Sequence, residues 1–358
     1  MKRRIGLGVF GVLVVAAVGL VWVAAQHYRT FLDTPLAVGG AGQIFELAPG
    51  TSYRGMVRRL AVAGLTTGAW PWRLYGRLER PVVQSGEYFI APGMTPRQWL
   101  DRVRRGEVVV HHFTVVEGWT LAQLRKALAA TPAITPCSAD WDDARLAAAL
   151  EHAPERPLEG RFLPATYDYT RGVCDLEILR RAYRAMAQAL AEAWAGRTAG
   201  VPYLTADELL TLASIVEKES ALSEERSRIA GVYVRRLERG MRLQADPTVI
   251  YGLGAGFDGN LRRADLRRDQ PYNTYTRGGL PPGPIALPGR GALEAAAQPA
   301  AGDSLYFVAS GGGGHAFAAT LAEHERNVDR YQRAPARRTP VVPPPETAGG
   351  DGGEGQVR

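Results

Sequence analysis

The chain has 358 residues, 46% of them hydrophobic and 22% charged, with a formal net charge of +7 at pH 7. About 300 residues remain when an apolar N-terminus and a Pro/Gly-rich C-terminus are set aside, enough for two domains with a sizeable core. The positive charge comes almost wholly from arginines scattered along the chain. This pattern favours a solvated surface close to an anionic membrane and argues against a nucleic-acid-binding protein.

The N-terminus predicts a membrane anchor. The basic residues Lys2-Arg3-Arg4 precede an uncharged apolar run at residues 5–25, about the length needed to cross a bilayer. A cleaved signal peptide, with its site at Val23-Ala24-Ala25, is the alternative, but its apolar region is normally shorter. The basic residues place residues 1–4 in the cytoplasm. We therefore expect a single-pass protein of the inner membrane, with the rest of the chain periplasmic and away from nucleic acid.

A short pattern occurs three times between about residues 35 and 130. A glycine stands two residues before a hydroxyl side chain in Gly50-Thr51-Ser52, Gly93-Met94-Thr95 and Gly118-Trp119-Thr120. Each repeat follows a β-type run and precedes an amphipathic helix. In the second repeat, an N-cap threonine, a proline and a glutamine mark a helix start, and Gly106 marks the end. The repeats predict an α+β scaffold and also suit a carbohydrate-binding module.

The histidines and cysteines do not predict a metal site. His111 and His112 are neighbours on an expected strand, where adjacent side chains face opposite ways. Cys137 and Cys174 are the only cysteines, and no histidine lies at ligand spacing from either. Two cysteines in an oxidising compartment often pair. We expect a disulfide between them, with two free buried thiols as the alternative, and no metal or cofactor.

Residues 134–200 are expected to be mostly helical, with one interruption. Between Glu159 and Tyr167, glycine and proline break the periodicity, and aromatic residues stand near an acid. This composition is typical of a loop that lines a groove, and a structural turn is the alternative.

A helix is expected from Thr205 to Ser220. Thr205 followed three residues later by Glu208 is a capping box, which marks the helix start. At about 100° per residue, one face of this helix is apolar. That face contains Leu212, Ile215 and Val216.

Glu219 falls within this apolar face, whereas Glu217 points to the opposite side, where a solvated glutamate is expected. Burial disfavours the charged form of a carboxylate and raises its pKa. A glutamate in such a place can act as a general acid near neutral pH. A helix-end glutamate whose carboxylate extends to water is the alternative.

Two polar segments follow a second helix expected near residues 224–240. The first contains Gln244, Asp246 and Thr248, and we expect an extended strand there because Pro247 disfavours helix at the residue before it.

The second segment contains Asn273 and Tyr275 on a loop rich in proline and glycine. An aromatic face combined with an amide suits sugar binding. If both segments converge beside Glu219, Asn273 would bind an N-acetyl group, Tyr275 would contact a sugar ring, and Asp246 would orient Gln244 or a loop amide. The alternative is that Asp246 and Asn273 only hold turns.

The C-terminal part predicts a strand at residues 305–309, a turn at 311–314 and then His315-Ala316-Phe317. Residues 334–358 are dominated by proline, glycine and charge, which predicts a disordered tail.

Several motifs together resemble the YceG-like family of endolytic murein transglycosylases, the MltG type. In chain order they are Leu212 to Ser220, Gln244 to Gly252, Tyr272 to Tyr275, Gly279 to Ile285 and His315 to Phe317. The resemblance covers about residues 35–333. It implies an α+β fold with a LysM-like module at 35–112 and a catalytic domain with a lysozyme-like site at 113–333.

The resemblance also implies a reaction. Glu219 would cleave the β-1,4 bond between N-acetylmuramic acid and N-acetylglucosamine in nascent glycan strands, leaving 1,6-anhydromuramoyl ends and terminating strand elongation. The residues expected to bind substrate are Gln244, Asp246, Thr248, Asn273, Tyr275 and Glu159. Glycan strands and the inner membrane are the expected partners, with peptidoglycan synthases as further candidates. A hydrolytic muramidase and a non-catalytic peptidoglycan-binding scaffold are the alternative functions.

Overall fold

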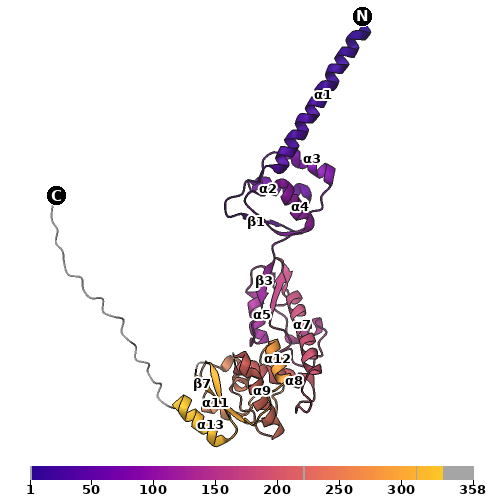
Figure 1. Ribbon diagram of the computed structural model, residues 1–358. Helices are drawn as coiled ribbons and strands as arrows, with labels where there is room; N and C mark the ends of the chain where they lie inside the picture. The colour runs from indigo at the N-terminus through magenta and orange to yellow at the C-terminus, as the bar shows by residue number, and fades with distance from the viewer. Residues whose placement is uncertain (1, 221, 312, 334–358) are drawn as a thin grey trace, which may run out of the picture. The chain divides into compact units, whose positions relative to one another are not determined.

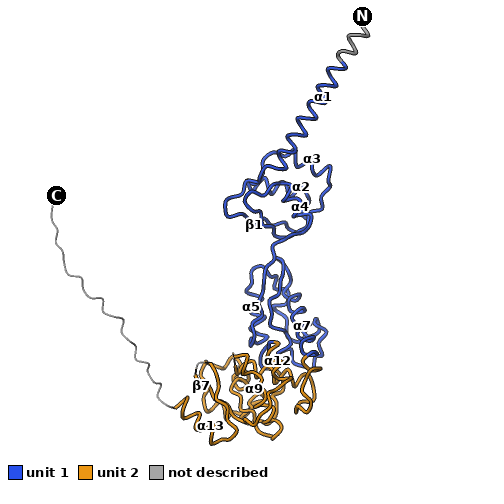
Figure 2. Tube along the Cα trace, in the orientation of Figure 1, with its two compact units in different colours: residues 1–192, 285–289 blue, residues 193–284, 290–358 orange. Residues whose placement is uncertain are grey.

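The structure is a computed structural model that describes residues 2–220, 222–311 and 313–333. It divides into two compact units, residues 1–192 with 285–289 and residues 193–284 with 290–358 (Figure 2). Helices and strands are mixed in both units, as the expected α+β class requires. The tail for which we predict disorder, residues 334–358, lies outside the described residues.

The first unit begins with the long helix α1 (Lys2–Asp33), seen at the N-terminal end of the ribbon (Figure 1). Its part from Phe10 to Asp33 has a mean hydropathy of 1.9 and is long and apolar enough to cross a membrane. The helix continues eight residues past the predicted anchor at 5–25. At its end, the Phe31 ring packs edge-on against Trp72, with the ring centres 5.1 Å apart.

A small α+β module follows α1. Its elements are β1 (Gln43–Leu47), α2 (Tyr53–Val62), α3 (Ala69–Glu79), β2 (Gly86–Ile90) and α4 (Pro96–Arg105). The two strands pair antiparallel from Gln43 opposite Ile90 to Leu47 opposite Gly86. The buried side chains of Met56, Leu60 and Trp99 belong to the core that joins the helices to this sheet.

The three glycine–hydroxyl repeats have the predicted strand–turn–helix structure. Gly50, Gly93 and Gly118 have φ angles of 76°, 79° and 76°, in a region that glycine enters at little cost. The hydroxyl residue of each repeat is the N-cap of the following helix, and its oxygen accepts a hydrogen bond from a backbone N–H. These N-caps are Ser52, Thr95 and Thr120, and the last two form complete capping boxes.

The rest of the first unit has its own core. Its elements are β3 (His111–Thr114), α5 (Leu121–Ala129), β4 (Ile134–Thr135), α6 (Asp143–Ala149), β5 (Thr166–Tyr169), β6 (Val173–Cys174) and α7 (Asp175–Ala195). Strands β3 and β5 pair antiparallel, and β4 and β6 pair parallel. Leu287 joins this core, and its backbone N–H donates to the Trp119 carbonyl.

Two histidines on β3 face opposite ways, as predicted. His111 Nε2 lies 2.5 Å from a Glu87 carboxylate oxygen, while His112 Nδ1 lies 2.7 Å from Asp168. They therefore contact different partners and share no site.

The second unit is mainly helical. Its elements are α8 (Ala206–Glu219), α9 (Ser223–Glu238), α10 (Asp246–Leu253), η1 (Gly254–Gly256), α11 (Arg263–Arg267), α12 (Arg290–Ala297), β7 (Tyr306–Gly311), β8 (Gly314–Ala318), α13 (Leu321–Val328) and η2 (Asp329–Arg333). Helix α12 packs on α8 and α9, and the hairpin β7–β8 packs on α9 through β7.

The strand expected around Asp246 is wrong, because Asp246 begins helix α10. Pro247 stands in the first turn, where its missing N–H has no helical partner to lose. The extended residue is instead Ala245, the N-cap, one position earlier than the preference before proline predicts.

Candidate active site

Glu219 is the last residue of α8 and is half-buried. The predicted capping box is present, since Thr205 accepts from the Glu208 N–H and Glu208 accepts from the Thr205 N–H. Every residue of α8 from Leu209 to Val216 is buried. The helix is therefore packed against other elements around its whole circumference. This packing fixes the position of Glu219 at its end.

Tyr233 on α9 is the direct partner of Glu219. Its hydroxyl donates a hydrogen bond of 2.5 Å to Glu219 Oε1, and its side chain is 1% exposed. Sequence reasoning did not single out Tyr233. The available signal was a tyrosine among the apolar residues of α9, and such a residue usually has a hydrogen-bond partner for its hydroxyl when buried.

The surroundings raise the pKa of the Glu219 carboxyl group to about 7. Burial is the largest cause, because it disfavours the charged form, and the nearby negative charge of Asp246 adds to it. The Tyr233 hydrogen bond and the electrostatic interactions with His315 and Arg236 act in the opposite direction. A substantial fraction of Glu219 is therefore protonated at neutral pH, as a general acid requires.

Glu217 is not the solvated glutamate that we expected. Its carboxylate lies 3.0 Å from the Arg226 guanidinium, and its side chain is only 4% exposed. The expectation failed because helical periodicity shows which face Glu217 occupies but not that the next helix covers that face. Glu217 therefore contributes an ion pair between α8 and α9.

Asp246 and Tyr275 form a second pair in the second unit. The Tyr275 hydroxyl donates a hydrogen bond of 2.5 Å to Asp246 Oδ1. Asp246 is exposed at the start of α10, and Tyr275 is half-buried. The negative charge of Asp246 raises the pKa of Glu219. The pKa of Tyr275 is also raised, mainly by burial and next by its contact with Asp246. Asp246 thus contacts a tyrosine rather than the amide that we expected.

Gln244 is exposed and has a φ angle of 51°, unusual for a residue other than glycine. Its backbone N–H donates to the Thr274 carbonyl. Its side chain lies on the surface, and a contact between Gln244 and substrate stays a prediction.

Asn273 and Thr248 are buried and hold the backbone. The Asn273 amide group donates to the carbonyls of residues 265, 266 and 268, and its oxygen accepts from the Tyr275 N–H. Thr248 contacts the Ala245 carbonyl and the Thr274 hydroxyl. Both side chains are 0% exposed. The structure supports the turn-holding alternative for Asn273, because its donors and acceptor are already used.

Glu159 belongs to the first unit and is 8% exposed. Its Oε1 atom accepts hydrogen bonds from the backbone N–H groups of Leu121 and Gly160. Leu121 is the first residue of α5. The Glu159 carboxylate beside it therefore also interacts favourably with the positive end of the helix dipole. These contacts favour a structural role, and a contact between Glu159 and substrate stays a prediction.

Arg236 is a buried cation that sequence reasoning missed. It is 7% exposed, and its guanidinium donates to the carbonyls of Leu243 (2.6 Å) and Leu305 (2.7 Å). Burial lowers the pKa of Arg236. The side chain joins α9 to the segment before α10 and to the residue before β7, and its charge acts on Glu219.

His315 on β8 is held by Glu225 of α9. The Glu225 carboxylate accepts from the His315 backbone N–H at 3.0 Å and lies 2.7 Å from Nδ1. The His315 ring packs edge-on against Phe307, and Phe307 packs edge-on against Tyr233. This row of rings connects the hairpin to the tyrosine that contacts Glu219.

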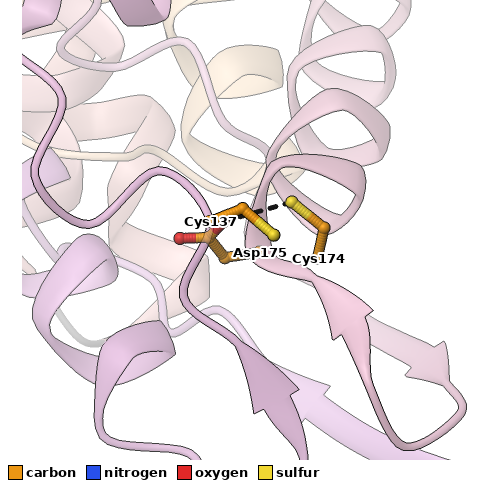
Figure 3. A group of neighbouring side chains, drawn as sticks. All are labelled: Cys137, Cys174 and Asp175. Carbon is orange, nitrogen blue, oxygen red and sulfur yellow. Dashed lines mark hydrogen bonds between the residues drawn. The ribbon is translucent and has the colours of Figure 1, made fainter.

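Cys137 and Cys174 are not bonded to each other, but both sulfur atoms and an Asp175 oxygen lie within 4.8 Å of one another (Figure 3). Burial raises the pKa of the Cys174 thiol to about 11. Both Asp175 oxygens already accept hydrogen bonds from Ser138, and one of them also from the Leu176 N–H. Asp175 is therefore a poor metal ligand, and the disulfide stays a prediction.

Comparison with known proteins identifies the family. Residues 45–330 match the YceG-like family, which is most of the chain. The chain belongs to the YceG-like family. The match includes the whole segment from α8 to β8 that contains Glu219 and its partners.

Several relatives of this YceG-like protein have named activities or solved structures. It is 32% identical over 264 residues to an endolytic murein transglycosylase of Bacillus subtilis, covering 69% of this chain and 73% of that protein. An endolytic murein transglycosylase of Streptococcus pneumoniae serotype 2 is 28% identical over 341 residues, which cover 85% of this chain but 61% of that protein. A crystal structure of a putative YceG-like protein from Listeria monocytogenes has a TM-score of 0.53 at 30% identity, covering 80% of this chain and 99% of that one.

Proposed function

We propose that this chain is a membrane-anchored lytic transglycosylase that cleaves the β-1,4 bond between N-acetylmuramic acid and N-acetylglucosamine within peptidoglycan strands. Membership of the YceG-like family and similarity to two endolytic murein transglycosylases support the enzyme class. The observation that carries the proposal for the site is the Glu219 carboxyl group, whose pKa is about 7 and which a buried tyrosine holds.

The first chemical step uses the protonated form of Glu219. Its proton passes to the glycosidic oxygen as the bond from that oxygen to the muramoyl C1 breaks. The sugar that leaves is neutral, and positive charge develops on the muramoyl ring. Burial of Glu219 favours this step because it keeps the acid protonated near neutral pH.

The second step uses the carboxylate that results. It removes the proton from the muramoyl C6 hydroxyl, and the C6 oxygen forms a bond to C1. The product is a 1,6-anhydromuramoyl end, and Glu219 regains its proton. The Tyr233 hydroxyl donates to the carboxylate, and this stabilises the charged form between the two steps. One carboxyl group is sufficient because the internal hydroxyl replaces the water of a two-carboxylate glycosidase.

The proposed setting is the outer face of the inner membrane. Helix α1 is long and apolar enough to anchor the chain, and the basic residues at its start favour a cytoplasmic N-terminus. An enzyme held there would meet nascent strands where they are made, which suits a role in ending strand elongation. The small α+β module of residues 35–112 is proposed to be LysM-like and to bind glycan.

The test is the mass of the products from purified peptidoglycan. We expect muropeptides with anhydromuramoyl ends, each lighter by one water than a product with a reducing end. Glu219→Gln should lower the turnover at least about 100-fold, while Glu224→Gln, a change of the same kind at an exposed residue of α9, should leave it unchanged. Reducing ends would instead identify a hydrolytic muramidase, and full turnover by Glu219→Gln would contradict the site.

A further inference from the structure

The positive charge of this chain is concentrated in α2 and α3. Residues 53–80 contain six arginines and one glutamate, a net charge of +5 out of +7 for the whole chain. Lys2, Arg3 and Arg4 supply a further +3, so the remaining residues are close to neutral. The arginines are spread along the whole sequence, but the excess of positive over negative charge outside the N-terminus lies in this segment.

These helices lie at the end of the apolar helix α1. The apolar run of α1 ends at Ala25, and the His27 ring stacks on Trp70 of α3 with the ring centres 5.3 Å apart and the planes 19° apart. Figure 1 shows α3 beside the end of α1. Trp70 therefore lies at the level where an inserted α1 leaves the hydrocarbon core.

Helices α2 and α3 both carry exposed apolar side chains and exposed cationic side chains. Val62 is 85% exposed, Leu78 is 63% exposed and Trp70 is 41% exposed. Exposed arginines accompany them on both helices, Arg59 three residues before Val62 on α2 and Arg73 and Arg77 between Trp70 and Leu78 in the sequence of α3. Large apolar side chains that are grouped with cations on a surface are typical of a binding face.

We propose that this face binds the anionic phospholipid headgroups of the membrane that α1 spans. We call it the α2–α3 surface and define it by Arg59, Val62, Trp70, Arg73, Arg77 and Leu78. The proposal depends on the proposed anchoring of α1 but not on the proposed cleavage reaction.

Two physical reasons favour headgroups as the partner. Tryptophan is enriched at the interface between membrane and water, because its ring is apolar and its N–H is polar. Arginines near the membrane are attracted to anionic lipids, and salt weakens this attraction within a Debye length. Binding would fix the orientation of the module at the bilayer.

The test uses the full chain in lipid nanodiscs of phosphatidylcholine alone or with added phosphatidylglycerol. Hydrogen exchange of peptides from residues 53–80 should slow in the anionic discs, and high salt should remove this protection. Peptides from α9 provide the internal reference. Glu219→Gln should show the same protection, because the surface does not depend on catalysis.

Matched variants test the arginines. Arg73→Gln with Arg77→Gln should abolish the protection that depends on phosphatidylglycerol, while Arg263→Gln with Arg267→Gln, an equal loss of charge on exposed positions of α11, should retain it. Equal exchange in both kinds of disc would overturn the proposal, as would protection that requires added peptidoglycan. A chain that does not co-elute with the discs would contradict both the proposed membrane anchor and the proposed lipid-binding surface. The cleavage assay does not depend on this result.

Discussion

Tyr233 and Glu219 are 14 positions apart in the sequence, and the tyrosine hydroxyl donates to the glutamate carboxylate at 2.5 Å. The donor lies on α9 and the acceptor ends α8, so the contact between these two helices sets the position of the proposed acid. A hydrogen bond to a carboxylate stabilises its charged form, whereas burial disfavours it. The opposition of these two effects leaves the Glu219 pKa at about 7.

Two substitutions should move the pH profile in opposite directions. The proposed mechanism requires protonated Glu219, so kcat/KM should fall above a pH of about 7. Asp246→Asn removes a negative charge that raises the Glu219 pKa, so the alkaline limb should move to lower pH. Tyr233→Phe removes a hydrogen bond that lowers this pKa, so the limb should move to higher pH. Measured profiles that shift in the same direction would contradict this electrostatic assignment.

Glu219→Gln should stabilise the folded protein at alkaline pH. The Glu219 pKa is raised from 4.5 to about 7, so its contribution to stability is fully present below pH 4.5 and is lost as the pH rises through 7. The difference corresponds to about 3 kcal/mol well above pH 7. The Tm of the variant should match that of the wild type at pH 4 and exceed it at pH 8, and Glu224→Gln should show no such pH dependence. A variant that is no more stable at pH 8 would argue against a buried acid.

Asn273→Ala should lower stability rather than the rate per folded molecule. The buried amide bonds to three carbonyls and one backbone N–H, and truncation removes these hydrogen bonds from a buried site, at a cost of about 1–3 kcal/mol. The Tm and the turnover should be measured in one preparation, with Gln244→Ala, at an exposed residue, for comparison. Loss of turnover at unchanged Tm would contradict this structural role and would indicate that Asn273 binds substrate.

Cys137 and Cys174 should form a disulfide in protein isolated from the periplasm. The sulfur atoms already lie within 4.8 Å, and closing the loop between the residues should stabilise the fold by about 2–4 kcal/mol in the chain-entropy model. Reductant should therefore lower the Tm of the wild type but not that of Cys137→Ser. Peptide mapping under non-reducing conditions gives the direct answer, and two alkylatable thiols would contradict the prediction.

Local interactions of the chain could be predicted from its residues. The helix starts at Thr95 and Thr205 and the glycine turns before the helices were predicted and are present, because each depends on residues within three or four positions of one another. Glu219 on the apolar face of α8 was identified for the same reason, since helical periodicity is a local property.

The tertiary structure alone decided which side chains meet. Tyr275 and Asp246 are 29 positions apart, and no local pattern pairs them. Glu217 is buried because Arg226 of the next helix covers it, and the Asn273 amide group donates to carbonyls in and directly after α11. The residue types needed for acid catalysis are thus visible in the sequence, whereas the pKa of Glu219 depends on burial and on charges that only folding brings together.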